Sequence, residues 1–315
     1  MMLPGTSDAL HRSRRSLHRP GIAAAVAFLV LATPVFAQDA KDQMAAFIDA
    51  NADQFGETAQ EIWELAEVGY METESSETLQ GLLRAEGFEI AAGVAGIPTA
   101  FVASWGGGGP VIGIMGEYDA LPGINQSRSA ERDPIPGKIA GHACGHHLFG
   151  TGSVAAAMAV KDWLEETGTI GTVRVYGTPA EEGGAGKVYM VRAGLMNDVD
   201  AMLHWHAGSR NDASASSSLA NKSAKIRFYG QSAHAAAAPW RGRSSLDGVE
   251  AMHDMINMMR EHVTPASRIH YVITAGGFAP NVIPDFAESY IYVRHPDPEE
   301  VRRMFDRVIL TAEGA

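Results

Sequence analysis

Residues 141–165 read GHACGHHLFGTGSVAAAMAVKDWLE, a histidine-rich turn that leads into a helix expected over 150–165. That helix is apolar on most of its faces, which is typical of a helix buried inside the protein. Short apolar runs lie on either side of it along the chain, at 111–115, 172–176 and 201–203, and each indicates a buried strand. The alternation of strands and helices predicts an α/β fold with a mostly parallel sheet and helices on both sides.

Further helices are expected before residue 208, and the order of elements changes after it. Apolar residues at helical spacing predict further helices at 40–70, 74–86 and 186–194. Residues 208–218 read GSRNDASASSS, and this small, polar stretch indicates a linker. After it we expect the order β-α-β-β-α, with the elements at 224–230, 244–261, 269–274, 286–294 and 298–312. A ferredoxin-like split β-α-β layer needs one more strand than this.

Residues 1–37 have the features of an export signal. Four arginines precede the uncharged run GIAAAVAFLVLAT at 21–33, and small residues then lead to a cleavage site expected after Ala37. The run is shorter than the roughly 18–20 residues that span a bilayer. We therefore expect a periplasmic or secreted protein, with an uncleaved anchor as the alternative. Two adjacent arginines, Arg14 and Arg15, leave Sec and twin-arginine export both open.

Composition narrows the class of protein. Without the first 37 residues the chain has 21 basic and 36 acidic side chains, a net charge of −15. Such a charge argues against binding to nucleic acid or to a membrane surface. Cys144 is the only cysteine in the sequence, so an intrachain disulfide is impossible. The lone thiol is a liability in an oxidising compartment unless it is buried or coordinated.

Acidic residues or histidines follow each of the three strands expected in the first half of the chain. Glu117 and Asp119 follow the first strand, the pair 181–182 follows the second, and the pair His204 and His206 follows the third. In open α/β sheets ligands bind at the carboxyl ends of strands, so we expect these side chains to meet there. A histidine-rich turn by itself is more often a polar loop than a metal site. Together with these clusters, however, the turn at 141–147 predicts a metal site.

Cys144 and His146 lie two residues apart in that turn, which lets both side chains face one point. Thiolate and imidazole are ordinary ligands of zinc and similar cations. Neighbouring residues at a strand end point to opposite sides, so one of Glu181 and Glu182 could bind metal while the other faces substrate. A divalent cation lowers the pKa of the water that it binds towards about 7, and a nearby carboxylate can accept the proton. The alternative for this pair is a solvated helix start.

Six motifs together resemble one enzyme family. The chain is similar to the di-metal amidohydrolases of the aminoacylase and carboxypeptidase-G-like peptidase superfamily, and within it to the branch that contains aminobenzoyl-glutamate utilisation protein B. The resemblance covers roughly residues 40–315. It rests on these stretches, in this order: GEYDALPG (116–123), GHACGHHLFGTGSVAAAMAVK (141–161), YGTPAEEGGAGK (176–187), DAMLHWHAG (200–208), SAHAAAAPWRGRSSLDGV (232–249) and APNVIPDFAESYIYVRHPD (279–297).

The resemblance implies a domain arrangement. Residues 38–215 would form the first part of a zinc-peptidase-like catalytic domain, with a mixed sheet flanked by helices. Residues 216–315 would form an inserted ferredoxin-like α+β lid that mediates dimerisation. The family has a further catalytic segment with a final ligand histidine, and this chain stops at Ala315. We therefore expect a C-terminally truncated chain that lacks the last lid strand and that segment.

The resemblance also implies roles for residues at the metal site. The family binds two divalent ions, here expected to be Zn²⁺ or Mn²⁺. Four ligands remain in this chain, which are Cys144, His146, Glu182 and His206, so one of the two metal positions would be incomplete. Glu181 would be the general base, and Asp119 would orient a ligand. His204 occupies a variable position in the family, so we expect a neighbour rather than a ligand. His147 stands where the family usually has Asn or Asp, which could alter the surroundings of the metals.

In the lid, the resemblance implies contacts with substrate. His234 would reach the active site of a partner subunit and stabilise the oxyanion. Asn281 would contact the substrate carbonyl, and Arg294 its carboxylate. A surface histidine and a turn asparagine are the alternatives. We expect His253 and His262 to be structural residues on the polar side of the 244–261 helix.

The function that follows is hydrolysis of the amide bond in N-acyl or N-aroyl amino acids, including compounds similar to aminobenzoyl-glutamate. Metal-activated water would attack, and the general base would carry the proton. The protein would act as a homodimer through the lid or together with a related subunit. The alternative is a truncated, catalytically impaired homologue that binds metal or another ligand. A serine hydrolase is disfavoured because Gly150-Thr151-Gly152-Ser153 lacks the G-x-S-x-G spacing.

Overall fold

The computed structural model describes residues 39–213 and 217–315. The expected export signal at 1–37 lies outside these residues, as does part of the expected linker. The chain divides into two compact units, with the boundary between Ser209 and Arg210. Each unit has its own sheet and its own apolar core. No helix in the described ranges is both long and apolar enough to cross a membrane.

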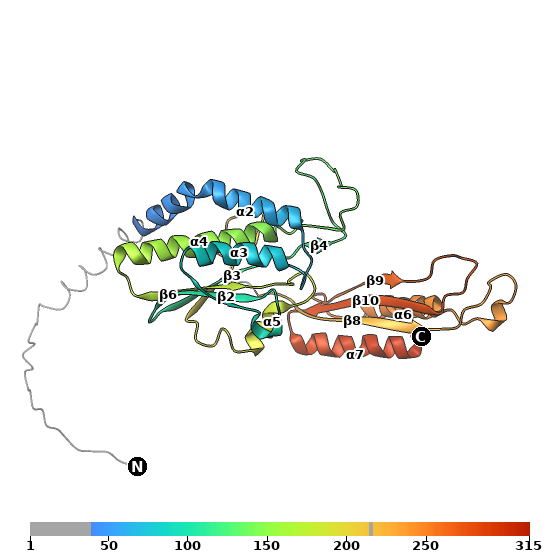
Figure 1. The fold of residues 1–315 in the computed structure, drawn as a ribbon. Coiled ribbons are helices and arrows are strands. Elements are labelled where there is room, and N and C mark those ends of the chain that lie inside the picture. The colour runs from blue at the N-terminus through green and yellow to red at the C-terminus, as the bar shows by residue number, and fades with distance from the viewer. Residues whose placement is uncertain (1–38, 214–216) are drawn as a thin grey trace, which may run out of the picture. The chain divides into compact units, whose positions relative to one another are not determined.

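The first unit contains a five-stranded mixed sheet (Figure 1). Its strands, in sheet order, are β1 (Glu89–Ala92), β2 (Phe101–Gly107), β6 (Gly171–Gly177), β3 (Val111–Gly116) and β7 (Ala201–Leu203). The β6–β3 and β3–β7 pairs are parallel, whereas β1–β2 and β2–β6 are antiparallel. The expectation of a mostly parallel sheet is therefore wrong. β1 and β2 are joined without a crossover helix, so the alternation of strands and helices could not reveal them.

Three helices cover one face of this sheet: α2 (Ala52–Leu65), α3 (Thr73–Ala85) and α4 (His146–Thr167). Their apolar side chains form the main core with β2, β3 and β6. The short helix α5 (Gly186–Arg192) contributes to a smaller core on the other face. The sheet therefore has helices on both faces, as expected from the sequence. The lengths of these helices differ from the expected lengths.

Two helix boundaries differ from those expected. The helix expected at 40–70 is two helices, because Asn51 separates a helix at 39–50 from α2. α2 ends at Leu65 because Ala66 has a left-handed backbone, with φ of +46°. α4 begins at His146 rather than at residue 150, so a candidate ligand is the first residue of the buried helix. The remaining short elements of this unit are η1 (Val94–Gly96), β4 (Leu121–Pro122) and β5 (Ala140–Gly141).

The second unit follows the expected order β-α-β-β-α closely. Its elements are β8 (Ala220–Tyr229), α6 (Ser245–Arg260), β9 (Arg268–Ala275), β10 (Phe286–His295) and α7 (Pro298–Gly314), with a short 3-10 turn η2 (Pro239–Arg241) before α6. β10 lies between β8 and β9 and is antiparallel to both. β8 and β9 are consequently parallel to each other across an inserted strand, which is the split β-α-β arrangement.

α6 and α7 pack against one face of this sheet and form a second apolar core. Met252 and Met259 lie in that core. His253 is also buried, which corrects its expected position on the polar side of the helix. Its Nε2 lies 2.7 Å from Ser289 Oγ, and its ring stacks on Tyr271 with 3.6 Å between centroids. A structural role for His253 agrees with these contacts.

Candidate metal centre

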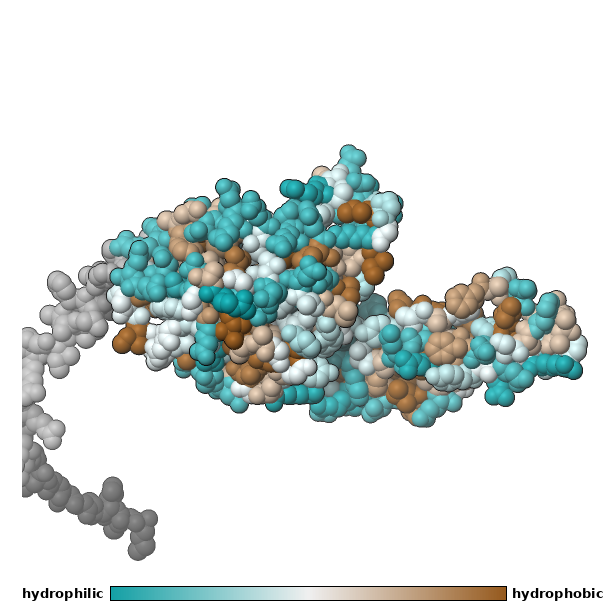
Figure 2. All heavy atoms as spheres, viewed as in Figure 1, coloured by the Kyte–Doolittle hydropathy of each residue, from teal (hydrophilic) through white to brown (hydrophobic). Residues whose placement is uncertain are grey.

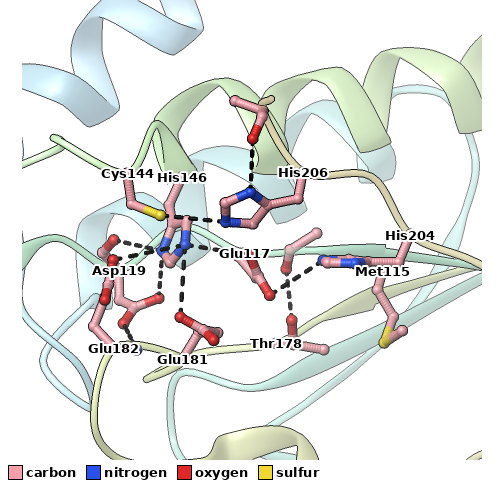
Figure 3. Close-up of polar contacts among 12 residues, drawn as sticks. Met115, Glu117, Asp119, Cys144, His146, Thr178, Glu181, Glu182, His204 and His206 are labelled. Atoms are coloured by element: carbon pink, nitrogen blue, oxygen red, sulfur yellow. Dashed lines mark hydrogen bonds and ion pairs between the residues drawn. The ribbon is translucent and has the colours of Figure 1, made fainter. Parts of the chain in front are cut away.

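His146 is the central residue of the site, and its side chain is fully buried in the first unit. Its Nδ1 lies 2.9 Å from Asp119 Oδ1 and 3.0 Å from the Asp119 carbonyl oxygen, so Nδ1 donates to Asp119. Burial alone would lower the pKa of His146. The hydrogen bond to Asp119 and the carboxylates of Asp119, Glu117 and Glu182 outweigh that effect and raise the pKa. Nε2 faces away from Asp119, towards the carboxylates of Glu117 and Glu182 (Figure 3).

Two groups of potential ligand atoms share His146. Cys144, His146 and His206 form one group, and His146, Glu181 and Glu182 form the other. Within each group the ligand atoms lie within 4.8 Å of one another. Cys144 Sγ is 3.3 Å from His206 Nε2. All four residues expected to bind metal therefore lie in one connected cluster, which also contains Glu181.

The two glutamates do not alternate as a strand would make them. β6 ends at Gly177, and residues 181–184 form a turn. As a result both carboxylates face the same atom, at 3.8 Å for Glu181 and 3.9 Å for Glu182 from His146 Nε2. The expectation that they point to opposite sides is wrong. They differ instead in exposure, because the Glu181 side chain is 43% exposed and that of Glu182 only 17%.

Unsatisfied polar atoms indicate that a cation fits this cluster. His146 Nε2, Glu117 Oε2 and Glu182 Oε1 are buried and have no hydrogen-bond partner within the described part of the chain. Leaving buried polar atoms unpaired is costly, and a cation bound by the second ligand group would satisfy the atoms of His146 and Glu182. Burial and the nearby carboxylates raise the pKa of the Cys144 thiol to about 12. A cation would be needed to stabilise the thiolate in these surroundings.

Glu117 lies at the edge of the sheet where its position after a strand predicts it, but the family resemblance gives it no role. Its Oε1 accepts hydrogen bonds from Lys187 and from His204 Nε2, the latter at 3.2 Å. Although burial opposes ionisation, these partners lower the pKa of Glu117 to about 2. Its Oε2 lies 3.3 Å from His146 Nε2. His204 belongs to neither ligand group of the described residues and contacts Glu117 instead.

His147 belongs to neither ligand group of the described residues and lies beside another histidine. The rings of His142 and His147 have centroids 5.1 Å apart. Burial lowers the pKa of each to about 4, so both imidazoles are neutral at pH 7. His142 Nε2 lies 3.0 Å from the carbonyl oxygen of Ile62, at the C-terminal end of α2. This pair therefore packs the histidine-rich turn against α2.

The three residues expected to contact substrate from the lid belong to the second unit. His234 Nδ1 accepts hydrogen bonds from the amides of Ala236 and Ala237, at 3.2 and 3.1 Å. An imidazole nitrogen that accepts hydrogen bonds carries no proton, so the proton lies on Nε2. The His234 side chain is exposed, with Nε2 available as a donor.

Asn281 lies beside His234, whereas Arg294 does not. The Asn281 carbonyl oxygen accepts a hydrogen bond from Ala235 N at 3.0 Å. Arg294 lies at the other end of β10, eight residues from Phe286, which is about 26 Å along a strand. Its guanidinium stacks over Tyr292, 5.1 Å from the ring centroid. The expected pair of substrate contacts therefore occupies opposite ends of one sheet.

The sequence pattern of peptidase family M20/M25/M40 matches residues 113–287, more than half of the chain. The chain belongs to the M20 peptidase family. It is 45% identical over 271 residues to the B subunit of p-aminobenzoyl-glutamate hydrolase from Escherichia coli (strain K12), a match that covers 85% of this chain and 56% of that protein. It is 32% identical to the Xaa-Arg dipeptidase of Mus musculus, over 83% of this chain and 60% of that one. These findings confirm the family resemblance.

A solved structure agrees with the fold of this M20 chain. A dinuclear metal-binding M20 peptidase from Bacillus subtilis superposes with a TM-score of 0.54 at 23% sequence identity. The superposition covers 84% of this chain and 70% of that protein. The chain spans a little more than half the length of the two curated relatives that it matches.

Proposed function

We propose that this protein hydrolyses the amide bond of N-acyl or N-aroyl amino acids, with aminobenzoyl-glutamate and similar compounds as the substrate class. The observation that carries the proposal is the cluster in which His146 belongs to two groups of ligand atoms at once. A relative at 45% identity is a subunit of a p-aminobenzoyl-glutamate hydrolase, which supports the substrate class.

Two divalent cations, Zn²⁺ or Mn²⁺, suit the donors of the cluster. One imidazole nitrogen binds one cation, so His146 would serve a single ion. Cys144 and His206 would hold a cation in one ligand group, and Glu182 would hold one in the other. Thiolate and imidazole favour zinc, whereas the carboxylates also suit manganese. Held there, the cations would act as Lewis acids that polarise the substrate carbonyl and lower the pKa of water.

Glu181 is the residue best suited to move the proton. It is the more exposed carboxylate of the pair, so it can reach both solvent and substrate. It would accept a proton from the attacking water and return it to the leaving amine. Asp119 would keep the His146 ring in place through its hydrogen bond to Nδ1.

His234 Nε2 would donate a hydrogen bond to the oxyanion, because its Nδ1 is already engaged by backbone amides. Asn281 would bind the substrate carbonyl and Arg294 its carboxylate. A single small substrate cannot contact both ends of one sheet about 26 Å apart. The separation therefore supports an assembly in which different subunits supply these residues, either a homodimer through the lid or a pair with a related subunit.

Residues 1–37 support export, so the proposed location is the periplasm or the outside of the cell. Mass spectrometry of protein recovered from an exporting host tests this proposal. A mature N-terminus at Gln38 is expected, and an intact Met1 on the exported protein would contradict cleavage.

The central experiment measures p-aminobenzoate release from aminobenzoyl-glutamate by the purified chain with Mn²⁺ or Zn²⁺. Glu181→Gln should lower kcat by about 10²–10⁴-fold while the number of bound metal ions is retained. Glu166→Gln, an exposed acid on α4, is the control and should leave kcat unchanged. Full activity of E181Q would overturn the general-base assignment. Metal binding without turnover in the unmodified chain would instead favour the impaired metal-binding homologue.

A further inference from the structure

Two buried carboxylates hold the turn that carries Glu181 and Glu182. Glu72 is fully buried, and its Oε1 accepts a hydrogen bond from Ala180 N at 2.7 Å. On the other side, Asp119 Oδ2 accepts from Glu182 N at 2.9 Å. The backbone is therefore anchored both before and after Glu181. Asp119 also contacts a candidate ligand, His146. The Glu72 carboxylate instead accepts hydrogen bonds from the Ala180 amide and from the Thr99 hydroxyl.

The anchored turn contains backbone strain. Ala180 has φ of +56°, and Tyr70 on the facing segment has φ of +68°. A residue other than glycine is strained in this left-handed region and stays there only when its surroundings enforce it. The short bond from Glu72 to the Ala180 amide is one such constraint.

Residues 69–72 contact the turn at three positions along the segment. A Cβ atom added to Gly69 would lie 2.9 Å from Ala180 Cα, so only glycine allows this close approach. The Tyr70 hydroxyl donates to the Gly184 carbonyl oxygen. Glu72 thus belongs to a segment that contacts the turn from Ala180 to Gly184, and it provides the charged contact.

The Glu72 carboxylate is itself fixed by a buried network. Its Oε2 accepts from Thr99 Oγ1 at 3.0 Å. The Thr99 carbonyl oxygen in turn accepts from Ser76 Oγ at 2.7 Å and Tyr118 Oη at 2.6 Å. Burial raises the pKa of Glu72, although the hydrogen bonds from the Ala180 amide and from Thr99 oppose the shift. Both carboxylate oxygens accept hydrogen bonds, which fixes the orientation of the side chain.

We propose that Glu72 is a positioning residue of the metal centre, which acts through the Ala180 amide to keep the Glu182 carboxylate in the ligand cluster. The proposal rests on the proposed function only for the premise that cations bind this cluster. Glu72 belongs to neither ligand group among the described residues, so its effect on the cations is indirect. Loss of a residue that orients a ligand typically weakens metal binding by about 10–100-fold.

The test is calorimetric titration of the purified chain with Mn²⁺, with circular dichroism to verify folding. Glu72→Ala should weaken Mn²⁺ binding by about 10-fold or more. Glu72→Gln should bind within a few-fold of the unmodified chain, because its amide oxygen still accepts the Ala180 N–H. Glu72→Asp keeps the charge but withdraws the oxygen by one methylene group, so its affinity should fall between the two. If E72A does not fold, E72Q and E72D are compared instead. Weaker Mn²⁺ binding by E72D than by E72Q supports the proposal, and equal affinities contradict it.

Glu67→Ala is the matched control. Glu67 is a carboxylate near the start of the same segment, but it bonds Ser75 N at 2.8 Å and Ser75 Oγ at 2.7 Å, at the beginning of α3. E67A should lower the unfolding temperature without changing the affinity for Mn²⁺. Equal loss of affinity in E67A and E72A would mean that Glu72 acts through general stability, and this would overturn the proposal.

A double-mutant cycle with Glu182→Ala separates positioning from packing. If Glu72 acts through Glu182, E72A should have little further effect on the cation that remains bound in an E182A background. The same fold-loss in both backgrounds would contradict the proposal. Failure of the premise that cations bind this cluster has a different signature, because the unmodified chain would then bind no Mn²⁺. Mn²⁺ binding without amide hydrolysis would contradict the proposed function and leave the role of Glu72 intact.

Discussion

Two buried histidines in this protein have opposite acid–base behaviour because their neighbours differ. Carboxylates surround His146 and raise its pKa despite burial. His253 lies against Ser289 and Tyr271 in an apolar core, so burial, assisted by Arg260, lowers its pKa. The sequence around each residue does not distinguish the two cases. The distinction arises from which side chains the fold brings to each ring.

His253 should make the second unit less stable as the pH falls. Its folded pKa lies below the ordinary value of 6.5, so the unfolded chain binds a proton first. Stability contributed by the neutral ring is therefore present above about pH 6.5 and declines as the pH falls towards the folded pKa. Urea unfolding between pH 5 and pH 8 measures this decline. His253→Phe keeps an aromatic ring beside Tyr271 but cannot titrate, so it should show a shallower pH dependence. Equal slopes in both proteins would contradict the prediction.

At the scale of elements, the contact between α4 and β3 positions the ligand cluster. α4 begins with His146, and β3 leads directly into Glu117 and Asp119. Gly150 lies where α4 approaches the chain just after β3. A Cβ there would be 2.9 Å from the Glu117 carbonyl oxygen and 2.9 Å from Leu79 Cδ1. The small residue therefore allows the helix to lie close to the acids that follow the strand.

Two glycine-to-alanine changes should have opposite effects on stability. Gly150→Ala overpacks the α4 contact and should lower the free energy of unfolding by about 1–3 kcal/mol. Gly81 lies inside α3 with no atom within 4 Å of an added Cβ, so Gly81→Ala should raise it by about 0.5–1 kcal/mol. Denaturant unfolding of both variants provides the measurement. Destabilisation by both changes would show that helix propensity at Gly81 is outweighed by another effect.

At the scale of the whole molecule, the two units differ in charge and in chemistry. Residues 39–209 contain 9 basic and 24 acidic side chains, a net charge of −15, whereas residues 210–315 contain 12 of each. Hydrophilic side chains cover much of the visible face of the first unit (Figure 2). Both ligand groups lie in this acidic unit. A strongly negative unit attracts cations, which is consistent with the proposed metal centre.

Metal should therefore stabilise the first unit selectively. At a Mn²⁺ concentration of 100 times Kd, binding adds about 2.7 kcal/mol to the stability of the unit that binds it. Hydrogen–deuterium exchange should slow in α4 and in residues 177–184, and it should remain unchanged in β8 and β10. Excess chelator should reverse the protection, and His206→Ala should reduce it. Protection confined to the second unit would contradict the location of the site.

Local sequence determined most of the secondary structure and the identity of the chemical groups. The five elements of the second unit lie within four residues of their expected bounds, because apolar periodicity records which face of each element is buried. Cys144, His146, Glu182 and His206, which the family resemblance implies as ligands, lie in one cluster. Such patterns are properties of short segments, so the sequence alone reveals them.

The tertiary structure decided which segments meet. It placed β1 and β2 in the sheet, turned Glu181 and Glu182 to the same imidazole, and brought Glu72 to an amide 108 residues away. It also separated Arg294 from His234 along one sheet. These features depend on strand pairing, on left-handed turns such as that at Ala180 and on buried hydrogen bonds between distant segments. No local pattern specifies such contacts, because each needs two parts of the chain that only the folded core brings together.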